Sequence, residues 1–85
     1  MATIPGYDGD TFCHLFTTAQ HYDATAGDYL EPTAAKPANI HSVRARSEAG
    51  PAYVLTDHAT HADAEAAAKL LAALIGIPHM TEESR

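Results

Sequence analysis

The amino-acid sequence predicts a small α+β protein of the order β-loop-ββα, in which a three-stranded antiparallel sheet carries one C-terminal amphipathic helix on one face. Three observations predict this fold class. Residues 51–78 contain a strand-like run, a helix N-cap, an apolar-periodic helix and a stop signal in direct succession. Residues 40–47 alternate polar and apolar side chains, and residues 11–19 are rich in aromatic and β-branched side chains.

The first predicted strand covers residues 11–19, TFCHLFTTA. Both of its faces carry apolar side chains, so we expect a central strand or a strand whose second face meets another subunit. Regular alternation divides the side chains between the two faces, with Phe12, His14 and Phe16 on one and Cys13, Leu15 and Thr17 on the other.

Residues 20–39 contain two prolines, a glycine and no sustained periodicity, which predicts a long irregular loop. After this loop, Val43 and Ala45 alternate with Arg44 and Arg46, as in a half-buried strand. Pro51 opens the next strand, where a proline is tolerated at the first position. The last two strands are therefore expected to form a hairpin that leads into the helix.

The C-terminal helix has recognisable ends. Thr60 followed by Asp63 is typical of a capping box, which predicts a helix start near His61. Gly76 suits a left-handed C-cap, and Pro78 cannot continue a helix. Glu65 and Lys69 are expected to pair on the side that faces away from the core. The core side is predicted to contain Ala64, Ala67, Ala68, Leu70, Leu71, Leu74 and Ile75.

Length and composition indicate one small domain over residues 11–78, with a flexible lead at 1–10 and a flexible tail at 79–85. The chain has 85 residues, a mass of 9.0 kDa and a formal net charge of −6, which disfavours nucleic-acid binding. Cys13 is the single cysteine, so no internal disulfide can form, and this usage is typical of a cytoplasmic protein. No apolar run approaches the length of a membrane span.

No catalytic signature, phosphate-binding loop or complete set of metal ligands is present, and no cofactor is expected. Tyrosines in the loop suit protein contacts, although they could instead cover the open edge of the core. The two arginines on one strand face could grip a carboxylate or phosphate, or form a solvated outer face. Alanines on the helix back let another element approach closely, or simply favour helix formation. The candidate partner-binding residues are Tyr22, Tyr29, Leu30, Arg44, Arg46, Ala62, Ala66 and Ala73.

A metal site is a weaker alternative. Asp57, His58 and His61 cluster at the strand exit and the first helical turn, where imidazoles and a carboxylate could approach one ion. The two histidines straddle the helix start rather than occupying one helical face, and Asp63 is already used in the capping box.

The ending DAEAAAKLLAALIG after a strand resembles the last strand and helix of double-stranded RNA-binding domains, and equally the strand-to-helix step of other small ββα modules. The resemblance covers the last third of the chain. The basic helix start that the RNA-binding family uses is replaced here by Asp63 and Glu65, so RNA binding does not carry over.

We therefore expect a small non-enzymatic binding, adaptor or inhibitor-like module that docks on another protein as a homodimer, without nucleic acid or membrane. The alternative is a small enzyme or ligand-binding subunit, with or without a metal ion. Its shallow pocket would lie between the 20–39 loop and the sheet, lined by His14, Tyr22, Tyr29 and Asp57. A concave pocket with converging polar groups favours the alternative, whereas a flat exposed apolar patch favours docking.

Overall fold

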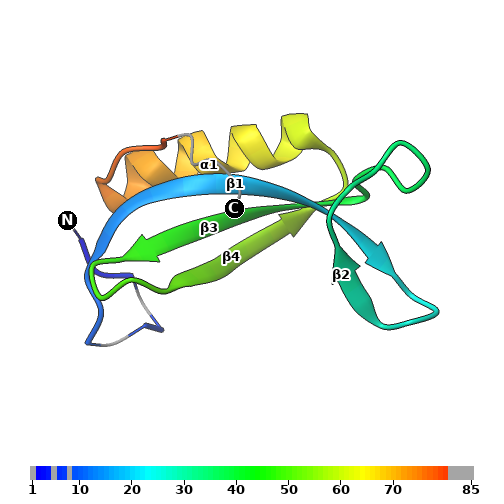
Figure 1. Cartoon of the computed structure of the whole chain (residues 1–85). Helices are drawn as coiled ribbons and strands as arrows, with labels where there is room; N and C mark the ends of the chain where they lie inside the picture. The colour runs from blue at the N-terminus through cyan, green and yellow to red at the C-terminus, as the bar shows by residue number, and fades with distance from the viewer. Residues whose placement is uncertain (1, 5, 8, 81–85) are drawn as a thin grey trace.

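The computed structural model describes residues 2–4, 6–7 and 9–80. Its elements follow the order β1 (Phe12–Asp23), β2 (Asp28–Leu30), β3 (Ile40–Ser47), β4 (Ala52–His58) and α1 (His61–Ile75). The strands form one antiparallel sheet in the order β2-β1-β3-β4, and α1 lies along one face of it (Figure 1). The predicted α+β class with a C-terminal helix is confirmed, but the sheet has four strands rather than three.

The additional strand arises inside the segment that was expected to be an irregular loop. β1 continues through residues 20–23 and turns into β2, with Tyr22 opposite Tyr29. The Asp23 side chain accepts hydrogen bonds from the backbone of Thr25 and Ala26, and Gly27 adopts a positive φ of 72° that completes the turn. The loop prediction therefore fails for the first half of residues 20–39, while residues 31–39 belong to no helix or strand.

A β-bulge at Cys13 changes the faces of β1. Phe12 pairs with Ser47 and His14 with Arg46, so Cys13 is an extra residue opposite no partner. Phe12 and Leu15 are both fully buried in the core beneath α1. The predicted alternation was wrong for Phe12, which lies on the core face rather than beside Phe16, because the bulge shifts the phase of the strand by one residue.

The core lies between α1 and the sheet. It also draws on chain segments outside these elements: Ile4 and Ile77 are buried in it, and Tyr7 packs edge-on against Phe12 and beside Tyr53. The Tyr7 hydroxyl donates to the Val54 carbonyl. Three positions of the predicted flexible lead, Ala2, Ile4 and Tyr7, thus contact the core, while Met1, Pro5 and Asp8 lie outside the described residues. The buried cluster is Ile4, Phe12, Leu15, Val43, Ala45, Ala64, Ala68 and Ile77.

The helix ends follow the predicted capping chemistry. The Thr60 side chain accepts a hydrogen bond from the Asp63 N–H, and Gly76 has φ 87° and donates to the Ala72 carbonyl. The predicted core side of the helix is partly wrong. Ala64 and Ala68 are buried, but Leu70 and Leu74 are 62% and 74% exposed.

The phase of the helix explains this difference. Ala64, Ala68, Leu71 and Ile75 lie at i, i+4, i+7 and i+11, which is one narrow stripe toward the sheet. At about 100° per residue, Leu70 and Leu74 fall roughly a quarter to a third of a turn away from the centre of that stripe.

After α1 the chain returns along β1. The Leu15 N–H donates to the Pro78 carbonyl at 2.9 Å, and the Met80 N–H donates to the Leu15 carbonyl at 2.8 Å. His79 and Met80 were predicted to belong to a flexible tail, whose remaining residues, 81–85, lie outside the described part of the chain. β1 is therefore bordered by β3 on one side, and by β2 and this C-terminal segment on the other.

Candidate functional site

The face of the sheet opposite α1 is the first candidate surface. Residues that pair across neighbouring strands lie on the same face of the sheet. Leu15, Val43 and their cross-strand partners therefore lie on the face that α1 covers. The alternate positions therefore face away from α1 and form what we call the open face. Its side chains come from all four strands: His14, Phe16, Thr18, Gln20 and Tyr22 from β1, Tyr29 from β2, Ser42, Arg44 and Arg46 from β3, and Val54 and Asp57 from β4.

Phe16 is the apolar anchor of the open face and is only 5% exposed. The Arg46 guanidinium lies over its ring, 5.1 Å from the ring centroid, and the His14 ring lies 5.9 Å away. Arg46 also donates from Nη1 to the Gly50 carbonyl at 2.7 Å. These contacts give Arg46 a packing role at this end of the sheet.

Two hollows lie at the other end of the open face. The first has a volume of about 340 Å³ and is lined by Tyr22, Tyr29, Asn39, Ile40, Asp57, His58 and Ala59. The second has a volume of about 280 Å³ and is lined by Gln20, Tyr29, Ser42, Arg44, Val54 and Asp57. Because Tyr29 and Asp57 line both, we call the two together the groove.

The β1–β2 hairpin forms one wall of the groove. The rings of Tyr22 and Tyr29 lie 4.9 Å apart, and the side chain of Asn39 bonds both the N–H and the carbonyl of Tyr22. Asn39 thereby ties the segment before β3 to β1. Tyr22 is 39% exposed and Tyr29 is 56% exposed, so this wall presents aromatic surface to solvent.

The floor of the groove carries two opposite charges with neutral partners. Arg44 donates from Nε to the Thr18 hydroxyl at 3.1 Å and from Nη2 to the Gln20 side-chain oxygen at 3.4 Å. Asp57 accepts from the Ser42 hydroxyl at 2.5 Å. Within the described ranges, neither Arg44 nor Asp57 takes part in an ion pair. Each charge is thus held in place without being neutralised by the other.

Asp23 fixes the turn of the hairpin. Its carboxylate accepts from the N–H groups of Thr25 and Ala26 and lies 3.5 Å from the Lys36 ammonium. The backbone N–H of Ala26, followed by the backbone N–H of Thr25 and the ammonium of Lys36, holds the pKa of Asp23 below its ordinary value of 3.8, although desolvation acts in the opposite direction.

A lowered pKa predicts how the hairpin responds to acid. We expect Asp23 to stabilise the folded state at pH values above 3.8, and this contribution to be lost as the pH falls through the lower folded-state pKa. A ¹³C NMR titration of the Asp23 carboxyl measures this pKa directly. Lys36→Gln should raise it while the two backbone donors remain in place. A wild-type value at or above 3.8 would contradict the described turn.

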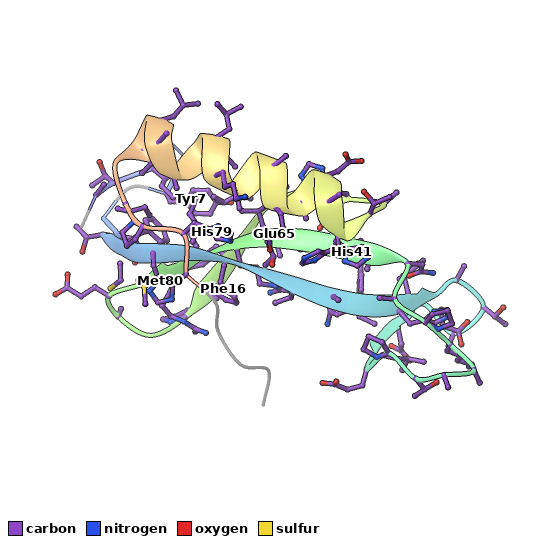
Figure 2. The ribbon with its side chains drawn as sticks, turned by 90° about the horizontal axis from the view of Figure 1, so that it is seen from above. Tyr7, Phe16, His41, Glu65, His79 and Met80 are labelled. Atoms are coloured by element: carbon purple, nitrogen blue, oxygen red, sulfur yellow. The ribbon has the colours of Figure 1, made fainter. Side chains whose placement is uncertain are left out.

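A second cluster lies between α1 and the sheet (Figure 2). Glu65 accepts from the Thr17 hydroxyl at 2.8 Å, and its other oxygen lies 3.5 Å from Nε2 of His79. His61 lies 3.7 Å from Glu65, and its ring lies 5.9 Å from that of His41. The predicted Glu65–Lys69 pair is therefore replaced by contacts that join α1 to β1 and to the C-terminal segment.

This cluster does not resemble a nucleophilic centre. The Thr17 hydroxyl donates to a carboxylate rather than to an imidazole that could act as its base. Cys13 is half-buried at the bulge, next in sequence to His14. The Glu65 cluster was not predicted, because its contact with Thr17 joins residues 48 positions apart in the sequence.

The candidate metal ligands point to different partners. Asp57 bonds Ser42 on the open face, Nε2 of His58 lies 2.8 Å from the Thr56 hydroxyl, and His61 lies near Glu65. The structure does not bring these three side chains together. In the described part of the chain, no group of three or more histidine, cysteine or acidic side chains could hold a metal ion.

The candidate partner-binding residues separate into two surfaces. Tyr22, Tyr29 and Arg44 line the groove, Arg46 lies on the same face beyond it, and Leu30 is half-buried at the end of β2. The alanines at 62, 66 and 73 are all exposed on α1. Of the four residues expected to line a pocket, Tyr22, Tyr29 and Asp57 line the groove, but His14 lies outside both of its hollows. Gln20, Ser42 and Val54 were missed, although the alternation of β1 and β3 places Gln20 and Ser42 on this face.

No family model, no curated protein and no solved structure matches this chain. The described residues form no helix that combines the length and the apolar character needed to cross a membrane.

Proposed function

We propose that this protein is a non-enzymatic docking module that associates with a second copy of itself through the outer side of α1. This outer side consists of Ala62, Ala66, Leu70, Ala73 and Leu74, all of them exposed. The observation that carries the proposal is that Leu70 and Leu74 are 62% and 74% exposed on a regular helix of 15 residues. Neighbouring exposed leucines on one helix side are typical of a protein contact.

Burial of these leucines would supply the driving force. Covering a leucine side chain contributes about 1.5–3 kcal/mol. The alanines beside them allow a second helix to approach closely, because its axis can lie nearer where side chains are small. The chain has 85 residues and few large buried side chains, so association would add to a thin margin of folding stability.

Charge complementarity favours a second copy as the occupant. Asp63 and Lys69 are both exposed and each lie three residues from Ala66. Two α1 helices packed antiparallel about a two-fold axis at Ala66 would bring Asp63 of one copy opposite Lys69 of the other, twice. The same arrangement sets Ala62 opposite Leu70, a small side chain against a large one. Lys69 has no ion-pair partner among the described residues, which supports this role.

Ala66→Glu tests this surface. We expect wild-type mass in sedimentation equilibrium to rise with concentration from 9.0 kDa toward twice that value, and Ala66→Glu to stay at 9.0 kDa, because the new carboxylates would face each other at the axis. Ala35→Glu, at an exposed position in the 31–39 segment, adds the same charge and should behave as wild type. Thermal unfolding that is equal for the variants and the wild type, measured at concentrations where the wild type is monomeric, would show that the fold is intact. A monomeric wild type, or Ala66→Glu that associates like wild type, would contradict the proposal.

A second candidate function is ligand binding at the groove. It is supported by two adjoining hollows that share Tyr29 and Asp57. The helix-to-helix dimer would leave both open faces accessible, because α1 lies on the other side of the sheet (Figure 1). The two functions are therefore compatible and can be tested separately.

A further inference from the structure

We propose that the groove binds a small zwitterion of the α-amino acid class, with its carboxylate at Arg44, its ammonium at Asp57 and an apolar side chain against Tyr29 and Val54. This inference deepens the second candidate function, ligand binding at the groove, and is independent of the dimer.

The first support is the size of the groove. Its hollows measure about 340 and 280 Å³, close to the lower limit of the range of about 300–1,000 Å³ in which proteins bind small molecules. The apolar wall of the smaller hollow is accessible, since Tyr29 and Val54 are 56% and 38% exposed. A ligand of a few carbon atoms could cover both side chains and gain from the apolar area removed from water.

The second support is the charge of the lining. The hollow of 280 Å³ contains one cation, Arg44, and one anion, Asp57. A ligand with a single charge would desolvate one of these groups without pairing it, which costs free energy. A zwitterion pairs with both.

The third support is the spacing of the two groups. Ser42 lies directly opposite Asp57, and Arg44 is two residues further along β3 on the same face. Such diagonal neighbours have backbones about 7–8 Å apart, which leaves room for a bridging group. Arg44 is held away from Asp57 by Thr18 and Gln20, while Ser42 holds Asp57. Arg44 uses Nε and Nη2 for these bonds, and a guanidinium has five N–H donors in all, so donors remain for a carboxylate.

An NMR titration with three related probes tests the ligand class. L-leucine carries both charges, leucinamide lacks the carboxylate, and 4-methylpentanoate lacks the ammonium. We expect L-leucine to shift the signals of Val54 and Tyr29, and the other two probes to bind at least about 10-fold more weakly, because each loses a charge-assisted hydrogen bond.

Matched variants locate the two contacts. Arg44→Gln and Asp57→Asn should each weaken L-leucine binding at least about 10-fold. Arg46→Gln removes an arginine from the same strand face outside the groove, and Asp28→Asn removes an acid from the hairpin. Both should bind like wild type, and thermal unfolding would verify the fold of all four.

The outcomes separate the ligand class from the ligand site. If 4-methylpentanoate or leucinamide binds as tightly as L-leucine at Val54 and Tyr29, the zwitterion is wrong while ligand binding at the groove stands. If Arg44→Gln and Asp57→Asn bind L-leucine like wild type, the assigned contacts are wrong. If none of the probes shifts Val54 or Tyr29, both the zwitterion and the second candidate function are wrong.

Discussion

Leu15→Ala should lower the free energy of unfolding by about 3 kcal/mol, within the range of roughly 2–5 kcal/mol for leucine deletions in cores. Leu15 is fully buried in the first half of β1, between β3 and the C-terminal segment, beneath α1. The substitution would leave a cavity between a strand and a helix whose contacting residues there are mainly alanines, which have little volume with which to fill it. Urea unfolding followed by circular dichroism measures the loss.

Leu74→Ala is the matched control, because it deletes the same atoms from a side chain that is 74% exposed. At concentrations where the protein is monomeric, it should change the free energy of unfolding by no more than about 0.5 kcal/mol. Similar losses of unfolding free energy for the two variants would mean that Leu74 lies in the core as well as Leu15. That result would contradict the described phase of α1.

Phe12→Ala should lower the free energy of unfolding by about 3–5 kcal/mol, the range for phenylalanine deletions in cores. Phe12 is fully buried, and its ring meets those of Tyr7 and Tyr53 edge-on at centroid distances of 5.9 and 6.0 Å. Removing it would leave both tyrosines without their common contact. The same urea titration measures the effect.

Two further variants accompany Phe12→Ala: one is a control for the loss of an aromatic side chain, and the other tests whether the bulge is needed to keep Phe12 on the core face. Tyr29→Ala removes an aromatic side chain that is 56% exposed and should cost far less than Phe12→Ala. Deleting Cys13 should also be mild, because Phe12 would then precede His14 directly and regular alternation would keep it on the core face. A deletion as damaging as Phe12→Ala would show that the bulge itself is required.

Local signals in the sequence predicted the helix and the last two strands well. Thr60 and Gly76 act within one turn of the helix ends, so their effect does not depend on the rest of the fold. The alternation of Val43 and Ala45 with the arginines likewise reports a sheet with one face toward the core.

The features that were missed depend on contacts distant in sequence. β2 has three residues, two of them exposed, so no apolar alternation marks it. The bulge at Cys13 is determined by the pairing of β1 with β3, which a single strand does not reveal. On α1, alanine and leucine cover most of the circumference, so the apolar pattern alone could not distinguish Ala64 and Ala68 from Leu70 as the core side.

The candidate sites, too, were predicted where the signal is local and missed where it depends on strand pairing. Tyr22, Tyr29 and Asp57 were assigned to one pocket by their chemistry, and the structure places them around the groove. The pairing of Ser42 with Asp57 and the support of Arg44 by Gln20 follow from strand register, which the sequence does not specify. His58 and His61 are close in sequence, but they lie at the end of a strand and the start of a helix and contact different partners.

The central claim is that α1 places Ala64 and Ala68 in the core and uses the exposed Leu70 and Leu74 for association. Methyl NMR spectra of the wild-type protein recorded over a dilution series test this most directly. The account predicts that the methyl signals of Leu70 and Leu74 move with concentration, while those of Leu15, buried in the core, stay in place. Signals of Leu70 and Leu74 that are unchanged at every concentration, or that move no more than those of Leu15, would contradict it.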